Sequence, residues 1–204
     1  MKVVIVTVPM MKEGKLKAQK YPVGEDKYIE VFSPINSILA KELENGEKIK
    51  VIYINTTGEN SESDKNMNVF TEELKNICEE KEVNWELTLI NIEFLPTNQT
   101  YNKIIKELSD NIPENAEIYV DITFSYKPAI LSLFCALRFV ELFRNAVIQY
   151  IVYGKVEFNK VTDEAEKPVL FDITSLYYLF KLMGTMGNAD AETATETLKD
   201  FFDM

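Results

Sequence analysis

The chain of 204 residues contains no histidine. This absence excludes Ser-His-Asp and Cys-His catalytic arrangements, histidine metal sites and histidine general bases, because each of them depends on an imidazole. A ribonuclease with a catalytic histidine is excluded for the same reason. Any catalysis must therefore use lysine, arginine, tyrosine, serine, threonine, aspartate or glutamate.

Glycine and cysteine are scarce, with seven and two residues. No Gly-x-Gly-x-x-Gly follows the first predicted strand and no Walker A motif occurs, so a conventional dinucleotide oxidoreductase or P-loop NTPase is not expected. Cys78 and Cys135 lie in apolar helical patterns, and we interpret them as buried thiols of a cytosolic protein. Asp121 and Asp172 offer two carboxylates without an acidic triplet, so no metal site and no cofactor is predicted.

The chain also lacks long hydrophobic runs and a positive balance of charge. No run reaches the roughly 18 uncharged apolar residues of a membrane span, and the apolar segment 2–9 lacks the cleavage site of a signal peptide. The net charge of −11 argues against a general nucleic-acid or acidic-membrane surface. No basic recognition helix is visible, so duplex DNA is not an expected partner. We expect a cytoplasmic protein that binds any anion through a local cluster of donors.

Strands and helices alternate along the chain. Apolar, β-rich runs predict strands at 2–8, 48–55, 85–92, 117–122, 147–153 and 169–173. Helical spacing predicts helices at 35–44, 67–81, 100–111, 129–143 and 174–183, and an acidic helix over 189–202. The alternation predicts an α/β fold, a Rossmann-like three-layer sandwich with a mostly parallel central sheet and a C-terminal helical extension. We divide the chain into a domain over 1–183 and a C-terminal helix or linker over 184–204.

Local signals refine these boundaries. Ser33 followed by Pro34 predicts an N-cap and a first helical residue, and Thr174 or Ser175 is the expected cap of the helix that follows it. Gly154 is interpreted as the end of its strand. Segment 10–24 has no clean period and is predicted as a loop or a small hairpin, either a solvated connection or a basic lip over the first strand.

The polar turn 123–128 joins the strand 117–122 to the helix 129–143, so it lies at the carboxyl end of a buried strand and over a helix N-terminus. Open α/β sheets bind ligands at such a place, and the free N–H groups favour anions. Lys127 is a predicted phosphate donor, with a solvated turn lysine as the alternative. Tyr126 is placed to stack on a base or to pack on the end of the sheet.

Further candidates surround this turn. Ser125 and Thr123 are predicted to donate to phosphate, with turn or capping roles as an equal alternative. Thr7, Met10 and Met11 follow the first strand, and the methionines are candidates to pack against a base or to fill the core. Thr56 and Thr57, after the second predicted strand, are weaker candidates at the edge of the site.

The segment DITFSYKP (121–128), followed by an apolar helix and then VYGKVE (152–157), resembles the CARF domain, the CRISPR-associated Rossmann fold. INTTGEN (54–60) is similar to the threonine-ended strand of that family, and 168–202 resembles the closing segment that leads into an effector domain. The resemblance covers most of the chain and is specific at 121–128 and 152–157. The frequent His-Gly-Phe-Arg turn of the family is Phe-Ser-Tyr-Lys (124–127) here, and the first loop (7–14) is not glycine-rich.

The resemblance implies binding of a cyclic oligoadenylate, above all cyclic tetra-adenylate, the second messenger of type III CRISPR antiviral immunity. It implies a homodimer with the messenger across its two-fold axis, and the apolar helix 129–143 also needs more cover than one sheet face gives. The leading hypothesis is a sensor domain, stand-alone or excised from a larger effector. The alternative is a ring nuclease that cleaves the messenger without metal by 2′-OH attack, with Lys127 and Ser125 as catalytic candidates. A transcriptional regulator with the same sensor is a third possibility.

Overall fold

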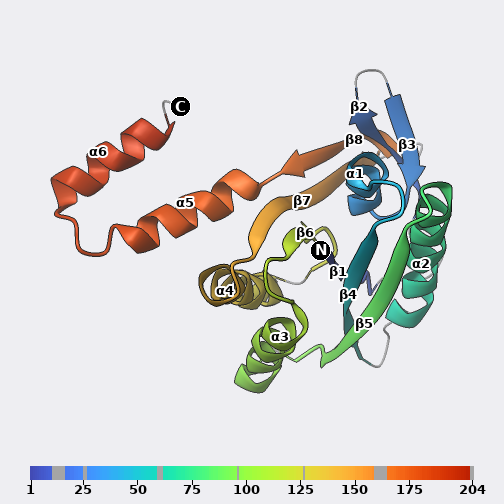
Figure 1. Cartoon of the computed structure of the whole chain (residues 1–204), viewed down its shortest axis with the longest axis horizontal. Helices are drawn as coiled ribbons and strands as arrows, with labels where there is room; N and C mark the ends of the chain where they lie inside the picture. The colour runs from blue at the N-terminus through green and yellow to red at the C-terminus, as the bar shows by residue number, and fades with distance from the viewer. Residues whose placement is uncertain are drawn as a thin grey trace.

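The computed structural model describes residues 1–10, 17–24, 27–58, 62–95, 97–125, 127–158 and 165–202. A six-stranded sheet in the order β5-β4-β1-β6-β7-β8 forms its centre (Figure 1). The strands are β1 (Lys2–Thr7), β4 (Lys48–Thr57), β5 (Asn84–Glu93), β6 (Glu117–Asp121), β7 (Val147–Phe158) and β8 (Ala165–Asp172). Neighbouring strands pair in parallel from β5 to β7, and β8 pairs antiparallel to β7.

Helices cover both faces of this sheet, with α1 (Ile35–Glu42) and α2 (Ser63–Glu80) on one face and α3 (Asn98–Asn111) and α4 (Lys127–Phe143) on the other. Helices α5 (Thr174–Thr185) and α6 (Ala191–Phe202) follow β8, and Figure 1 shows α6 away from the sheet. One hydrophobic core lies between the sheet and α1 with α2, and a second lies between the sheet and α3 with α4. The predicted Rossmann-like three-layer sandwich with C-terminal helices is therefore confirmed.

Strand β1 shows why the sequence gives a sheet that is buried on both faces. Successive side chains of a strand point to opposite faces. Val3 and Ile5 belong to the core under α3 and α4, whereas Val4 and Val6 belong to the core under α1 and α2. An unbroken apolar run is therefore what a central parallel strand requires.

The segment before α1 forms a two-stranded antiparallel sheet of β2 (Gln19–Gly24) and β3 (Lys27–Val31). Figure 1 shows this hairpin beside α1, on the side of the molecule where β7 ends and β8 begins. Tyr21 is buried, as is Val31. Of the two predictions for segment 10–24, the small hairpin is confirmed for residues 19–24, and residues 11–16 lie outside the described part of the chain.

The helix starts differ from the sequence prediction. Ser33 does not cap α1 through its side chain, because Pro34 is the cap residue and already has helical dihedral angles. The N–H groups of Phe32 and Ser33, just before α1, and of Ile35, its first residue, bond instead to carboxylates from distant elements, as described below. Thr174 and Ser175 do not cap α5 either, since Ile173 precedes the first helical residue and makes no side-chain capping bond.

Two single-residue predictions are also wrong. Gly154 does not end its strand, because β7 continues to Phe158. A side chain at position 154 would collide with Pro34, so glycine is needed there for close approach and not for chain reversal. Cys78 is buried as predicted, but Cys135 is exposed on α4.

Candidate functional site

The order of the strands has a switch point between β1 and β6. From β1 the chain moves outward through β4 to β5, then returns to β6 on the other side of β1 and continues to β7. In open α/β sheets, ligands bind outside the carboxyl ends of the strands at such a point. The turn that follows β6 lies there, because Val6 at the end of β1 pairs with Asp121 at the end of β6.

The predicted site residues come from three neighbouring strands. Thr7 ends β1, Thr56 lies one residue before the end of β4, and Thr123 follows β6 by two residues. The structure therefore brings them to one edge of the sheet. Thr7 and Thr56 are buried, and Met10, three residues beyond β1, is half-buried. Met11 and Tyr126 lie outside the described residues.

A buried carboxylate organises the turn. Asp121 is 1% exposed. One of its oxygens, Oδ1, accepts a hydrogen bond from the backbone N–H of Thr123 at 2.8 Å, and Oδ2 accepts one from the N–H of Ile35 at 3.1 Å. The same carboxylate therefore closes the turn after β6 and caps the first turn of α1. The sequence marks Asp121 as a strand-end acid, but its partner at the start of α1 is 86 residues away.

Two hydroxyl groups and one backbone N–H of the site already have partners within the protein. The Thr123 Oγ1 accepts a hydrogen bond from the N–H of Gly154 at 2.9 Å, which ties the turn to β7. The Thr7 Oγ1 donates to the carbonyl oxygen of Asp121 at 3.3 Å. The N–H of Ser125 donates to the carbonyl oxygen of Ile122 at 3.1 Å. These three hydrogen bonds fix the turn within the protein without a ligand. The bonds of Thr123 and Ser125 are structural ones, as expected of the turn roles given above as their alternative.

The N-terminus of α1 is occupied by protein carboxylates. Glu73 of α2 accepts hydrogen bonds from the N–H of Phe32 at 2.6 Å, from the N–H of Ser33 at 3.3 Å and from the side chain of Asn36 at 2.9 Å. Burial raises the pKa of Glu73, and these three bonds oppose that rise. Together with Asp121, Glu73 leaves the start of α1 a poor place for an external anion.

The N-terminus of α4 carries a cation. Lys127 is the first residue of α4 and is exposed, and Pro128 follows it in the first turn. The first-turn N–H groups of a helix lack partners within the helix and bear a partial positive charge. An exposed lysine therefore stands at a helix N-terminus beside the switch point. This combination suits a phosphate group.

The tyrosines near Asp121 are held in the protonated form. Burial, reinforced by the nearby Asp121, raises the pKa of Tyr21 to about 12 and raises the pKa of Tyr53 further still. Burial also raises the pKa of Asp121, and its bonds to Thr123 and Ile35 oppose that rise. Neither phenol is suited to accept a proton near neutral pH.

A separate cavity lies at the carboxyl end of β5, and of its lining residues only Thr57 was a candidate from the sequence. Its volume is about 380 Å³. It is lined by Thr57, Asn91, Ile92, Glu93, Leu95, Thr97, Gln99, Thr100 and Lys103. The ammonium group of Lys103 donates to the carbonyl oxygen of Asn91 at 2.6 Å, so that cation is already bonded. Because β5 is the edge strand, this cavity lies two strands away from the switch point.

No model of a known protein family and no curated protein matches the chain. In the described part of the chain, none of the helices combines the length and the apolar character that crossing a membrane requires. Among the same residues, no three acidic or cysteine side chains gather in a way that would hold a metal ion. Whether the residues at the switch point bind a ligand stays a prediction.

Proposed function

We propose that this chain is a sensor domain for a cyclic oligoadenylate, with cyclic tetra-adenylate as the preferred ring, in type III CRISPR antiviral signalling. The observation that carries the proposal is the position of the turn 121–127 at the switch point, with Lys127 at the start of α4. The resemblance of 121–128 and 152–157 to the CARF domain supplies the class of ligand. The two segments are adjacent, because Asp121 pairs with Val152.

The chemistry of the turn fits a phosphodiester ring. Lys127 supplies a cation, and the first turn of α4 supplies backbone N–H groups. Thr123 and Ser125 of the same turn carry hydroxyl groups, of which that of Thr123 also accepts a hydrogen bond from Gly154. Two copies of this turn in a homodimer would present the same donors twice, which matches the two-fold symmetry of a cyclic tetra-adenylate. In this arrangement each copy contributes half of the site.

The overall charge supports a local rather than a general affinity for anions. With a net charge of −11, the chain repels polyanions at long range. Binding must then depend on short-range contacts at the turn. Added salt should weaken binding modestly, because only a few charged contacts are screened. This is the behaviour of a receptor for a small signalling nucleotide and not that of a nucleic-acid-binding surface.

Sensing is favoured over ring cleavage by the state of the nearby acids and bases. Attack of a ribose 2′-OH needs a group that accepts a proton, and the chain has no histidine. The pKa values of Tyr21 and Tyr53 are raised, which is the wrong direction for a general base. We therefore expect slow cleavage or none, with Lys127 and Ser125 as the first residues to replace if cleavage occurs.

A thermal-shift comparison of cyclic tri-, tetra- and hexa-adenylate tests the proposal. A ring present at 100 times its dissociation constant should stabilise the fold by about 2.7 kcal/mol. Lys127→Ala should weaken binding, since a charge-assisted contact contributes about 1.5–3 kcal/mol. Lys75→Ala is a matched control, because Lys75 is an exposed lysine on α2 in an ion pair with Glu79. No shift with any ring would refute the proposal, and equal affinity of both variants would move the site elsewhere.

Incubation of the ring with the protein in EDTA, followed by separation of linear products, distinguishes a sensor from a nuclease. The sensor proposal expects the ring to remain intact, or to be cleaved over minutes or longer. Several turnovers per second would instead establish a ring nuclease that acts without metal.

A further inference from the structure

Two aromatic side chains lie partly in water on the strands β7 and β8. Tyr153 and Phe171 stand directly opposite each other in the antiparallel pairing of these strands. Their ring centroids are 6.4 Å apart, and the planes of the two rings differ by 24°. Tyr153 is 40% exposed and Phe171 is 43% exposed, so neither ring is taken up by the core. We call these two rings the aromatic pair.

The aromatic pair lies on the face of the sheet where α4 packs. Successive side chains of a strand point to opposite faces. Ile151 belongs to the core under α3 and α4, and Val152 belongs to the core under α1 and α2, so Tyr153 shares the face of Ile151. Leu170 packs against the core under α1 and α2, which puts Phe171 on the same face as Tyr153. Both rings are therefore on the α4 side of the sheet.

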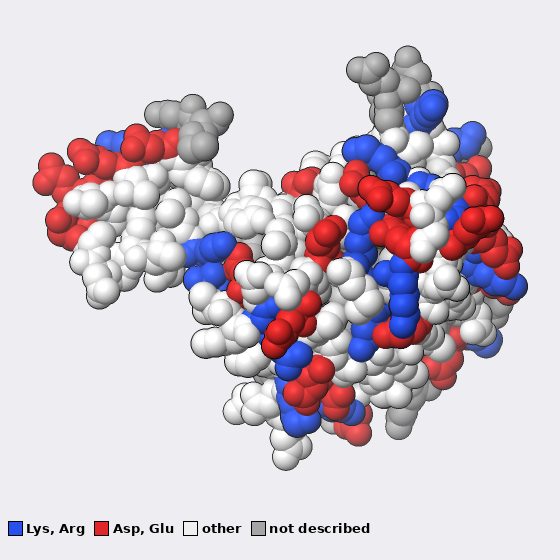
Figure 2. All heavy atoms as spheres, in the orientation of Figure 1, with Lys and Arg blue, Asp and Glu red and all other residues white. Residues whose placement is uncertain are grey.

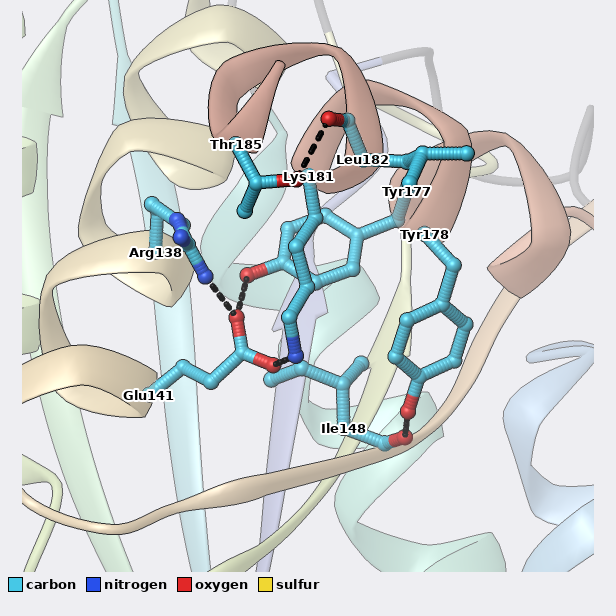
Figure 3. A network of polar contacts seen from close by, with 8 residues as sticks. All are labelled: Arg138, Glu141, Ile148, Tyr177, Tyr178, Lys181, Leu182 and Thr185. Atoms are coloured by element: carbon cyan, nitrogen blue, oxygen red, sulfur yellow. Dashed lines mark hydrogen bonds and ion pairs between the residues drawn. The ribbon is translucent and has the colours of Figure 1, made fainter. Parts of the chain in front are cut away.

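Helix α5 covers a different part of this face. The hydroxyl oxygen of Thr174, at the start of α5, accepts a hydrogen bond from the N–H of Ile151 at 2.8 Å. One turn later, the hydroxyl group of Tyr178 donates to the carbonyl oxygen of Ile148 at 2.9 Å (Figure 3). Helix α5 thus follows β7 from residue 151 back towards residue 148. It runs away from Tyr153, which explains why that ring stays exposed.

A network of polar contacts fixes α5 in this position. Glu141 of α4 forms ion pairs with Lys181 of α5 and, at 2.9 Å, with Arg138 of its own helix (Figure 3). The hydroxyl group of Tyr177 donates to the same carboxylate at 3.1 Å. Glu141 lies near the carboxyl end of α4, so α5 is held against that end. The opposite end of α4 begins with Lys127, which is exposed.

The backbone under the aromatic pair is bonded to the turn at the switch point. The N–H of Gly154 donates to Oγ1 of Thr123 at 2.9 Å. The N–H of Ile122 donates to the carbonyl oxygen of Val152 at 3.0 Å. Tyr153 lies between these two bonded residues of β7. Because adjacent strands are about 4.8 Å apart, its backbone is one strand spacing away from the turn that leads into α4.

The starts of α4 and α5 differ in charge. At α5, the carboxylate of Asp172 accepts hydrogen bonds from the N–H of Thr174 at 2.9 Å and from the hydroxyl group of the same residue. At α4, the first residue is the exposed Lys127. A phosphate group is therefore favoured at the start of α4 and repelled at the start of α5. A nucleotide held in this way has its base free to reach the neighbouring rings.

We propose that Tyr153 and Phe171 form a stacking platform for the base of a purine nucleotide whose phosphate binds at the start of α4. The inference rests on the proposed function and deepens it, because it names the residues that take the adenine. Every base has a flat π-face, and stacking on aromatic side chains is a common way of holding unpaired nucleotides. A purine covers more of two adjacent rings than a pyrimidine does, so the platform favours adenine over uracil.

A long nucleic-acid strand is a poorer occupant of this platform. Proteins that hold single strands combine aromatic side chains with a basic groove that follows the backbone of the strand. Figure 2 shows basic side chains interspersed with acidic ones on the face drawn, and the net charge is −11. The aromatic pair therefore suits a small nucleotide with few phosphates.

The fluorescence of 2-aminopurine tests the platform, because stacking on an aromatic ring quenches this purine analogue. The probes are cyclic tetra-adenylate with one adenine replaced by 2-aminopurine, and 2-aminopurine riboside 5′-monophosphate. We expect the full chain to quench both probes. Tyr153→Leu and Phe171→Leu should each raise the dissociation constant about tenfold, since each removes a π-face. Tyr28→Leu is the matched control, because Tyr28 is an exposed tyrosine on β3.

Two further measurements separate stacking from damage to the fold. Phe171→Trp keeps a π-face and should retain the binding and the quenching that Phe171→Leu loses. Competition with adenosine and uridine 5′-monophosphates gives the preference for adenine. Lys127→Ala should weaken both competitors alike, because it removes a phosphate contact. Phe171→Leu should weaken the adenine nucleotide more than the uracil one, which a purely structural role of Phe171 would not do.

The outcomes for the platform and for the sensor are distinct. If the ring binds and both leucine variants behave like Tyr28→Leu, the platform is wrong and the proposed sensor stands. If the monophosphate binds through the aromatic pair and no cyclic oligoadenylate gives a thermal shift, the sensor is refuted and the platform stands. A wild-type chain that binds neither probe would overturn both.

Discussion

Gly154 on β7 allows the sheet to approach the start of α1, and replacing it tests how closely the two elements are packed. A Cβ atom added at this position would lie 2.4 Å from Cγ and 3.1 Å from Cβ of Pro34, and 3.0 Å from the hydroxyl oxygen of Tyr21. Ordinary contacts between carbon atoms are about 3.5–4.0 Å. The proline ring is stiff, and the N–H of the next residue, Ile35, is bonded to Asp121. Gly154→Ala therefore requires the backbone to move.

The size of the effect follows from two opposing contributions. Overpacking of this kind costs about 1–3 kcal/mol. Alanine is less flexible than glycine, so the substitution lowers the conformational entropy of the unfolded chain. This effect alone raises the free energy of unfolding by about 0.4–1 kcal/mol. Because the nearest atom belongs to a ring and not to the end of a flexible side chain, we expect Gly154→Ala to lower the free energy of unfolding by about 2 kcal/mol.

Urea unfolding followed by tryptophan fluorescence measures this loss. Gly184→Ala is the control, because a Cβ atom there meets nothing within 4 Å and alanine favours the helix by up to about 1 kcal/mol. The double variant Gly154→Ala with Pro34→Ala removes the 2.4 Å contact, so its loss should be smaller than the sum of the two single losses. An unchanged stability for Gly154→Ala, or simple additivity in the double variant, would show that the reasoning from close packing is wrong.

Three further predictions concern Asp121, Glu141 and the thiols. Asp121→Asn places an amide NH₂ group against the N–H of either Thr123 or Ile35, so one hydrogen bond is lost. We expect urea unfolding to show a free energy of unfolding lower by about 1–3 kcal/mol. Although burial raises the pKa of Glu141, its bonds to Lys181, Arg138 and Tyr177 outweigh burial and lower it. Glu141 therefore stabilises the fold above the ordinary glutamate pKa of about 4.3 and loses that effect as pH falls through its lower folded value. Melting curves should show the gap between wild type and Glu141→Gln closing at acidic pH. Under native conditions a maleimide should label Cys135 but not Cys78, whose pKa is raised to about 11 by burial and then by Glu47.

The sequence predicts the sheet well because its evidence is local. Apolar, β-rich runs and turn residues occur within a few positions of each strand, and the carboxyl ends of neighbouring parallel strands must share an edge. The placement of Thr7, Thr56 and Thr123 on one edge follows from this rule alone. The prediction that the turn after strand 117–122 lies at the switch point is confirmed for its described residues, and the ligand of that turn stays a prediction.

The errors concern interactions between residues far apart in sequence. The acids that satisfy the start of α1 come from positions 73 and 121, and no local pattern pairs them with residues 32–36. Local sequence rules place Gly154 at the end of a strand. Glycine is required there because a side chain would collide with Pro34. Cys135 has the helical spacing of a core residue, but α4 is apolar on more than one side. Periodicity alone does not show which of these sides packs against the rest of the protein.

The bonds of Asp121 have a consequence for the timing of local opening. Its two oxygens are joined to one carbon atom, and each holds a backbone N–H from a different element, Thr123 in the turn and Ile35 in α1. Rotation of the carboxylate about its bond to Cβ breaks both hydrogen bonds in one event. The turn at the switch point and the first turn of α1 therefore belong to a single opening unit, and their amide protons become available to solvent together rather than independently.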